Sequence, residues 1–248
     1  MIAIIAAVAD ESRLLRQWLF PCEVRRCGRR DLYWGNLFGR RIALMHCGVG
    51  KANAAATATL LLEQNLPSLL IAIGCAGAYP DSSLAIGDLV LASEELYADE
   101  GVITGDGFRD FASLGFPLLQ ENGATLPCRF PIPTDLLASA RPFIEQSARD
   151  AGCKLLMGPL VTVSTCSGTL AAGRDIARRT GGVAENMEGA AIAQICREYG
   201  VPFLEIRGIA NRVENRDLAT WDLPAASRNA QQAVRALLQG WSSPPRRA

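Results

Sequence analysis

Histidine is almost absent from the sequence, which contains one, His46, among 248 residues. A single imidazole cannot build a metal site that needs several histidines, and it has no obvious nucleophile partner in the sequence. We therefore expect His46 to be a residue at the end of a strand.

An excess of either charge is also missing. Lys and Arg together number 25, as do Asp and Glu, and no basic run is interleaved with aromatic residues. Proteins that bind nucleic acids usually carry such a basic patch. The composition therefore argues against a nucleic-acid partner, and we expect a small-molecule partner.

No apolar stretch of about 18 residues is free of charges and turn-forming residues, so no membrane span is predicted. The apolar run at residues 2–8 has no positive segment before it and is followed at once by Asp10 and Glu11. These flanks indicate a buried first strand and not a signal peptide. We expect a cytoplasmic protein with no membrane partner.

The cysteines lack the spacing of metal ligands or of a disulfide framework, although there are eight of them. They are scattered, and several stand within apolar runs. We expect most of them to be buried, reduced thiols. They are Cys22, Cys27, Cys47, Cys75, Cys128, Cys153, Cys166 and Cys196.

A hydrophobic content of 49% with 20% charged residues suits one large domain with a sizeable core. Apolar runs alternate with helical patterns, which predicts an α/β fold: a single-domain, three-layer α/β/α sandwich around a twisted, mixed, largely parallel sheet. Strands are expected near 2–8, 41–47, 68–74, 87–93, 158–164 and 201–207. Helices are expected near 10–19, 51–64, 134–150, 168–179, 187–199 and 225–240.

Two segments depart from this alternation. Residues 97–133 are rich in Gly and Pro, which predicts long loops near the site or at a subunit contact. The polar, Pro-containing segment 242–248 is expected to be a disordered tail. The catalytic domain is therefore predicted to span residues 1–241.

Two glycine clusters follow predicted strands. Residues 48–53 resemble a dinucleotide fingerprint only loosely, because Asn53 replaces the third glycine, so bound NAD is not expected. A tight turn that packs a helix is the favoured interpretation. Residues 74–77 end an apolar strand, where small residues let a ligand approach the backbone.

The most informative segment sets two carboxylates, Glu185 and Glu188, at the start of an apolar helix. Glu188 is expected in the first turn, where a carboxylate is stabilised by the helix dipole. A short apolar strand follows the helix, and Arg207 and Asn211 are expected just beyond its C-terminal end. Open α/β sheets bind their ligands at that edge.

These segments resemble the purine nucleoside phosphorylase and nucleosidase superfamily over most of the chain. The resemblance implies that superfamily's fold, catalysis on a purine nucleoside, no metal or organic cofactor, and a homo-oligomer of two or more subunits. It lies in residues 4–15, 47–55, 74–80, 86–95, 185–188 and 207–211, in Arg216–Asp217 and in Trp221–Asp222.

The resemblance also implies roles for individual residues. Glu11 matches the catalytic glutamate of the methylthioadenosine/adenosylhomocysteine nucleosidases and would be the general base, ionised at neutral pH with an ordinary pKa. From the sequence alone it would be a helix N-terminal acid. Arg207 would orient this base and its water. Glu188 would bind the ribose hydroxyls, with Met187 packed against the sugar.

Asn211 stands where the adenine-specific nucleosidases have an aspartate. A carboxamide can accept from a protonated purine N7 and donate to a 6-oxo group, so Asn211 favours hypoxanthine over adenine. The remaining substrate-binding candidates are Cys75, Ala76 and Gly77. Cys75 replaces a serine of the nucleosidases, and that serine's role does not transfer to it. Four aromatic candidates for holding the 5′ substituent are Tyr97, Phe108, Phe111 and Phe116.

We therefore expect a hydrolase that cleaves the N-glycosidic bond of a 6-oxopurine nucleoside. A methylthioadenosine/adenosylhomocysteine nucleosidase and a 6-oxopurine phosphorylase are alternatives. Glu11 argues against phosphorolysis, because a carboxylate near the reacting face of the sugar repels phosphate, although Arg13 could contribute to an anion site. A non-catalytic nucleoside-binding or storage protein is the third alternative, since fold does not fix function.

Overall fold

The structure is a computed structural model, and it describes residues 1–116, 118–121, 124–126 and 128–241. The predicted disordered tail, 242–248, lies outside these residues. In the described part of the chain, no helix is long and apolar enough to cross a membrane.

All six predicted strands are present, and four of them are longer than expected. The apolar residues of the first strand are buried along its whole length, which confirms a core strand at the N-terminus. The six are β1 (Ile2–Ala6), β4 (Arg40–His46), β5 (Leu69–Ala78), β6 (Leu89–Tyr97), β12 (Leu155–Thr162) and β14 (Phe203–Arg212).

The sequence did not predict four further strands of the main sheet. They are β2 (Cys22–Cys27), β3 (Arg30–Leu37), β11 (Arg129–Pro131) and β13 (Ala184–Asn186). Across the described residues, the strand order is β11-β6-β12-β13-β5-β1-β4-β3-β2, and β14 pairs with both β5 and β6.

The sheet is mixed, as predicted, with parallel pairing at its centre. Strand β1 runs parallel to β4 and β5, and β14 runs parallel to β5. The pairs β2–β3, β3–β4 and β11–β6 are antiparallel, and so are β13–β5 and β14–β6. Strand β12 is also parallel to β6 and β13, so parallel pairs predominate in the interior of the sheet, where β13–β5 and β14–β6 are the antiparallel exceptions.

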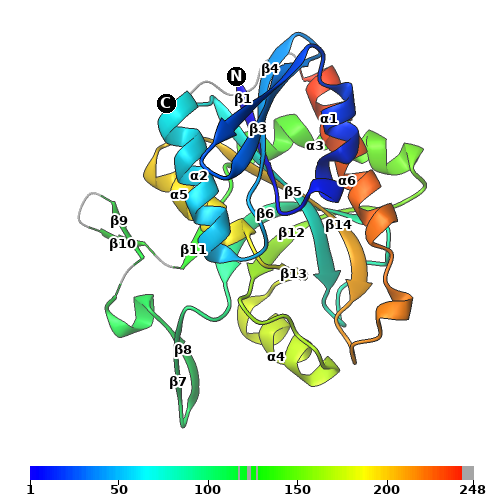
Figure 1. The fold of residues 1–248 in the computed structure, drawn as a ribbon. Coiled ribbons are helices and arrows are strands. Elements are labelled where there is room, and N and C mark those ends of the chain that lie inside the picture. Colours follow the sequence, from blue (N-terminus) through cyan, green and yellow to red (C-terminus); the bar gives the residue numbers. More distant parts are fainter. Residues whose placement is uncertain (117, 122–123, 127, 242–248) are drawn as a thin grey trace.

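Helices cover both faces of the sheet, which makes the predicted three layers (Figure 1). Helices α2 and α5 pack against each other on one side, and α3 packs on α6 on the other. All six predicted helical segments are confirmed: α1 (Arg13–Trp18), α2 (Lys51–Asn65), α3 (Thr134–Asp150), α4 (Leu170–Thr180), α5 (Gly189–Glu198) and α6 (Leu223–Gly240). Short 3-10 helices are η1 (Ala9–Ser12), η2 (Ala112–Leu114) and η3 (Leu218–Thr220).

The segment predicted to form long loops contains two antiparallel hairpins that extend from the body (Figure 1). Its glycines therefore serve turns between short strands as well as loops. In the first hairpin, Gly107 follows the turn with φ +110°, a conformation that L side chains rarely adopt. The strands are β7 (Gly101–Thr104), β8 (Gly107–Asp110), β9 (Leu119–Glu121) and β10 (Ala124–Leu126).

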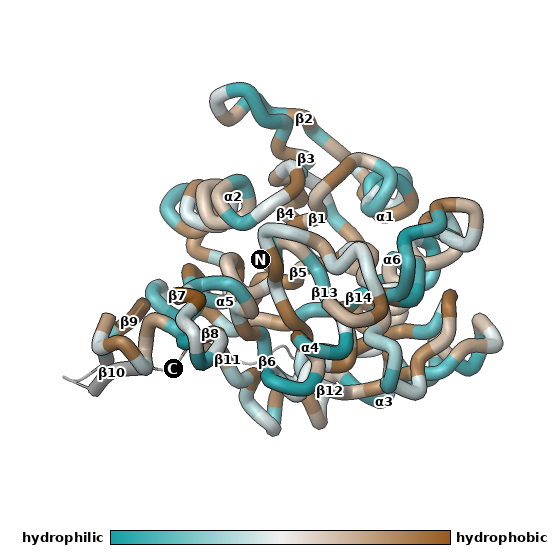
Figure 2. Tube along the Cα trace, turned by 90° about the horizontal axis from the view of Figure 1, so that it is seen from below, coloured by the Kyte–Doolittle hydropathy of each residue, from teal (hydrophilic) through white to brown (hydrophobic). Residues whose placement is uncertain are grey.

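The hydropathy colouring in Figure 2 shows where the apolar chain segments lie. The edge strand β2 mixes hydrophilic and hydrophobic residues, and five of its six residues are exposed. His46 is the last residue of β4, as predicted. The eight cysteines are all free, but only Cys47, Cys128 and Cys196 are buried, so the prediction that most are buried is wrong.

Candidate active site

Glu11 lies in η1, immediately after the central strand β1. Its Oε2 accepts hydrogen bonds from the backbone N–H groups of Ala7 at 2.9 Å and Val8 at 3.2 Å. Its Oε1 accepts from the backbone N–H of Cys75 at 2.8 Å. Three backbone donors therefore fix the direction of this carboxyl group.

The surroundings of Glu11 change its pKa. Burial raises the pKa, and the charge of Glu188 adds to that rise. The positive charge of Arg207 and the N–H of Cys75 act in the opposite direction but do not cancel the effect of burial. The pKa of Glu11 is therefore higher than the ordinary value expected from the sequence.

Gly74 is what allows Glu11 and Arg207 to approach each other. A Cβ atom at position 74 would lie 2.6 Å from Glu11 Oε1 and 2.5 Å from Arg207 Nη1, closer than real Cβ contacts. The backbone of β5 thus fills the space between the two side chains. The glycine expected to admit a ligand instead admits two side chains of the candidate site.

Glu188 is the N-cap residue of α5 and is buried. Its Oε1 accepts from the backbone N–H of Gly50 at 3.0 Å, and its Oε2 accepts from Arg207 Nη1 at 3.3 Å. Gly48 and Gly50 have φ values of +84° and +101°, which confirms the predicted tight turn. That turn therefore reaches the candidate site through one backbone N–H.

Arg207 is only 2% exposed and lies inside β14, paired with Gly74 of β5. The expectation that Arg207 and Asn211 follow the strand is wrong, because β14 continues to Arg212. Arg207 Nε donates to Glu205 Oε1 at 2.6 Å, and Nη1 also donates to the carbonyl oxygen of Cys75 at 3.2 Å. Opposite charges on this strand and its neighbours therefore make a buried arginine tolerable.

Cys75, Ala76 and Gly77 lie in β5, and Cys75 contributes through its backbone. Its N–H binds Glu11 and its carbonyl oxygen binds Arg207, so this one peptide segment links both charged side chains. Burial raises the pKa of the Cys75 thiol to about 12. The thiol is therefore protonated at neutral pH.

Asn211 and Met187 lie beside this cluster. Asn211 pairs with Gly77 across β14 and β5 and is half-buried, and its Nδ2 donates to the carbonyl oxygen of Arg212 at 3.1 Å. Met187 precedes Glu188 and packs against a small apolar cluster that contains Tyr79. Within the described residues, no hydrogen bond joins Asn211 to Glu11, Arg207 or Glu188.

Glu185, the other carboxylate of the predicted helix start, faces a different neighbour. It lies in β13 and accepts from the backbone N–H of Ser167 at 2.8 Å and from its hydroxyl at 2.7 Å. Burial raises the pKa of Glu185 despite these donors. It is a separate, partnered carboxyl group.

Three residues near the cluster were missed from the sequence: Glu95, Asn186 and Glu205. Glu205 had a signal, because it precedes Arg207 by two positions in an apolar strand and so shares its face. Glu95 and Asn186 had none, since their contacts cross between distant strands. Within the described residues, no group of three or more His, Cys, Asp or Glu side chains is arranged to hold a metal ion.

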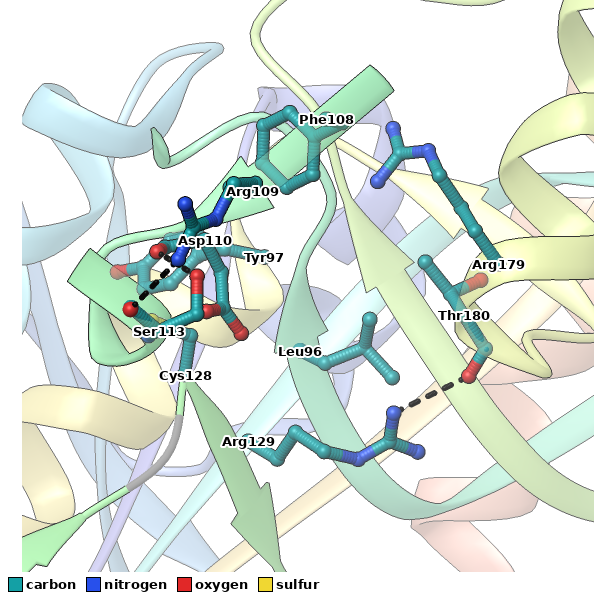
Figure 3. A pocket seen from close by; sticks show the side chains of 10 residues that line it. All are labelled: Leu96, Tyr97, Phe108, Arg109, Asp110, Ser113, Cys128, Arg129, Arg179 and Thr180. Atoms are coloured by element: carbon teal, nitrogen blue, oxygen red, sulfur yellow. Dashed lines mark hydrogen bonds between the residues drawn. The ribbon is translucent and has the colours of Figure 1, made fainter. Parts of the chain in front are cut away.

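A cavity of about 360 Å³ lies elsewhere, between the β7–β8 hairpin and the end of α4 (Figure 3). Its arginines have other partners: Arg129 binds Glu94 and the carbonyl oxygen of Thr180, and Arg179 lies 3.6 Å from Asp175. Two of the four aromatic candidates for the 5′ substituent, Tyr97 and Phe108, line it, but none of the other predicted catalytic or substrate-binding residues does. It is lined by Leu96, Tyr97, Phe108, Arg109, Asp110, Ser113, Cys128, Arg129, Arg179 and Thr180.

Comparison with known proteins identifies the class to which this fold and site belong. The sequence pattern of the Phosphorylase superfamily matches residues 1–239. The chain therefore belongs to the Phosphorylase superfamily.

Individual relatives narrow this class. The chain is 35% identical over 207 residues to futalosine hydrolase of Thermus thermophilus, covering 84% of this chain and 85% of that protein. It is also similar to the 5′-methylthioadenosine/S-adenosylhomocysteine nucleosidase of Neisseria meningitidis, whose structure was solved with methylthio-immucillin-A. The two chains are 26% identical, the TM-score is 0.82, and the match covers 96% of this chain and 98% of the nucleosidase. The Colwellia psychrerythraea nucleosidase, solved with adenine, matches at 27% identity and TM-score 0.83, covering 97% and 95%. The chain is thus a nucleosidase-family enzyme.

Proposed function

We propose that this enzyme is a futalosine hydrolase, which uses water to cleave the N-glycosidic bond of futalosine. The products would be hypoxanthine and dehypoxanthinyl futalosine, a step of menaquinone biosynthesis. The observation that carries the proposal is the approach of Glu11 and Arg207 at Gly74, with Arg207 bonded to Glu188 and Asn211 further along the same strand as Arg207. The similarity to the Thermus thermophilus futalosine hydrolase supports the same substrate.

Hydrolysis of a nucleoside passes through a sugar with oxocarbenium character, so the site must activate water and stabilise positive charge. Glu11 is the proposed general base. Its three backbone donors hold the carboxyl group in one orientation, and its raised pKa makes it a stronger base than an exposed glutamate. Arg207, beside it across Gly74, keeps its charge and positions the base and its water.

Glu188 is the proposed ligand of the ribose hydroxyls. A carboxylate there accepts two hydroxyl hydrogens and places negative charge near the developing cation. In the structure its oxygens accept from Gly50 and Arg207, and these donors hold it in place for that task. Met187 would pack against the sugar.

Asn211 is the proposed determinant of the base. Its Oδ1 would accept from a protonated N7, and the Nδ2 hydrogen that does not bind Arg212 would donate to the 6-oxo oxygen. An aspartate carboxylate would repel that oxygen. The backbone of Cys75, Ala76 and Gly77 would line the site between the base and the sugar.

The test is purine release from futalosine, inosine and methylthioadenosine, each with and without phosphate, with chromatography of the base and sugar products. We expect hypoxanthine from futalosine alone, at a rate independent of phosphate. Adenine from methylthioadenosine would make the chain a nucleosidase of the adenine type. A rate that requires phosphate would make it a phosphorylase.

A further inference from the structure

Two more carboxyl groups meet beneath the start of α5, outside the mechanism proposed above. Glu95 of β6 and Glu205 of β14 are both 0% exposed. They face each other next to Gly189: a Cβ atom there would lie 2.6 Å from Glu95 Oε1 and 2.3 Å from Glu205 Oε2. The first helical residue must therefore be small for the two acids to fit.

The charges around this point do not balance if every acid is ionised. Arg207 is the cation that the structure places among Glu11, Glu188 and Glu205. Glu95, next to Glu205, is a fourth acid near the same cation. An uncompensated charge in the interior is strongly disfavoured, so a buried acid without its own cation tends to keep its proton. Burial, followed by the charge of Glu205, raises the pKa of Glu95 well above its ordinary value.

The hydrogen bonds indicate where such a proton would be used. Glu205 Oε1 accepts from Arg207 Nε at 2.6 Å, but Glu205 Oε2 is a buried oxygen for which the described residues supply no standard donor. Glu95 Oε1 faces that oxygen. A proton on Glu95 Oε1 would satisfy it, and a buried acceptor left without a donor is costly.

We propose that Glu95 is a neutral carboxylic acid that donates its proton to Oε2 of an ionised Glu205, and that this acid–carboxylate pair positions Glu188 and Arg207. The positioning role rests on the proposed function, in which Glu188 binds the ribose. The proton is held in the pair and is neither consumed nor transferred during the reaction.

The pair reaches Glu188 by two routes. Through Glu205 it holds the guanidinium of Arg207, which donates to Glu188. Through Asn186, whose Nδ2 donates to Glu95 Oε1 at 3.2 Å, it orients an amide that caps α5. Oδ1 of that amide accepts from the backbone N–H groups of Glu188 at 2.9 Å and Gly189 at 2.7 Å.

The first experiment locates the proton by infrared spectroscopy of the purified protein at neutral pH. We expect a C=O band of a buried, protonated carboxyl group that shifts in heavy water and is lost in Glu95→Gln. The band should remain in Glu94→Gln, the matched control, because Glu94 pairs with Arg129 at the sheet edge. A band that remains in Glu95→Gln and disappears in Glu205→Gln would place the proton on Glu205 and contradict the proposal. A wild-type spectrum without the band would also overturn it.

The second experiment separates positioning from general support of the fold. Glutamine at position 95 can still donate to Glu205 and accept from Thr162, which lies 2.9 Å from Glu95 Oε2, but it loses the acceptor for Asn186. We therefore expect kcat/KM for the nucleoside to fall about tenfold or less in Glu95→Gln. Glu95→Ala and Glu205→Gln should reduce it by roughly 100-fold or more, because each leaves a buried group unpaired.

The affinity for the free base distinguishes a positioning role from a merely structural one. Inhibition by hypoxanthine should change less than threefold or so in folded Glu95→Ala, since the pair acts on the ribose side. An equal loss for base and nucleoside, or full activity of Glu205→Gln, would refute the positioning role. If the wild type released no purine at all, the proposed function would fail, while the infrared band would still decide where the proton lies.

Discussion

At the scale of single residues, Glu11 is the general base of the proposed mechanism. We predict that Glu11→Gln lowers kcat by at least about 100-fold, because an amide cannot accept the proton of the attacking water. Hypoxanthine binding, measured by calorimetry, should be retained. Glu198→Gln, on the exposed end of α5, is the matched control and should behave as the wild type. Turnover of Glu11→Gln at the wild-type rate would remove this residue from the mechanism.

The pH profile of the wild type follows from the same group. The base must be ionised, and burial raises the pKa of Glu11 above 4.5. We therefore expect kcat/KM to fall with decreasing pH along a limb whose midpoint lies above 4.5. This limb should be the one that Glu11→Gln eliminates.

In the proposed function, Asn211 determines which purine base is accepted. We predict that Asn211→Asp lowers kcat/KM for the 6-oxopurine nucleoside by roughly 100-fold or more, since a carboxylate faces the 6-oxo oxygen without a donor. Its melting temperature should change little, because Asn211 is half-buried. Asn36→Asp, at an exposed position of β3, makes the same chemical change away from the site. Equal turnover by both variants would contradict the assignment of Asn211.

At the scale of elements, the fit between β5 and its neighbours decides whether the site can form. We predict that Gly74→Ala reduces kcat by roughly 100-fold or more, because the added Cβ would overlap both Glu11 and Arg207. Gly105→Ala is the control, since nothing lies within 4 Å of a Cβ there. A Gly74→Ala enzyme with normal kcat would show that Glu11 and Arg207 need not approach each other so closely.

Which elements could be predicted depends on how much of each is buried. The strands found from the sequence are apolar runs in the core, whereas β2 is exposed on five of six residues and β13 has only three. The end of β14 was placed too early, because Arg207 and Asn211 look like solvent-facing residues. Glu205 on the same strand and Glu188 at the start of α5 make Arg207 tolerable inside β14, and sequence spacing does not reveal the contact with Glu188.

The same limit applies to the site. Glu11, Glu188 and Arg207 were selected as candidates from their place at strand and helix ends and from resemblance. The bond from Gly50 to Glu188, by contrast, joins residues 138 positions apart. The contact between Glu95 and Glu205 could not be predicted for the same reason, since β6 and β14 are distant in sequence. Contacts between residues so far apart in the sequence can be identified only once the fold is known.

At the scale of the whole molecule, the hairpin segment between β6 and β11 leaves apolar side chains exposed. Ile103 is 84% and Phe116 70% exposed. We predict that the chain self-associates through this segment, and that Ile103→Asp shifts the mass measured by light scattering towards the monomer. Val24→Asp, at an exposed position of β2, should leave the mass unchanged. A monomeric wild type at micromolar concentration would contradict this prediction.

The way in which the stability of the whole fold changes with pH should depend on His46. Burial, together with the charge of Arg16, lowers the pKa of His46 from 6.5 to about 4, and the charge of Asp31 does not cancel this effect. Its ring lies 2.6 Å from the Ser12 hydroxyl, next to η1. Between pH 6.5 and about 4 the unfolded chain therefore binds a proton that the folded chain excludes, so stability falls as the pH falls through this range.

Glu11 acts in the opposite sense, because its raised pKa lets the folded chain bind the extra proton above pH 4.5. The contribution of His46 must therefore be isolated by difference. We predict that His46→Gln, which cannot titrate, loses less stability than the wild type between pH 6.5 and 4, as measured by urea unfolding at each pH. Above pH 6.5 the gap between the two proteins should be constant. If the unfolding free energies of the two proteins changed in parallel between pH 6.5 and 4, the imidazole would gain its proton as easily in the folded chain as in the unfolded one.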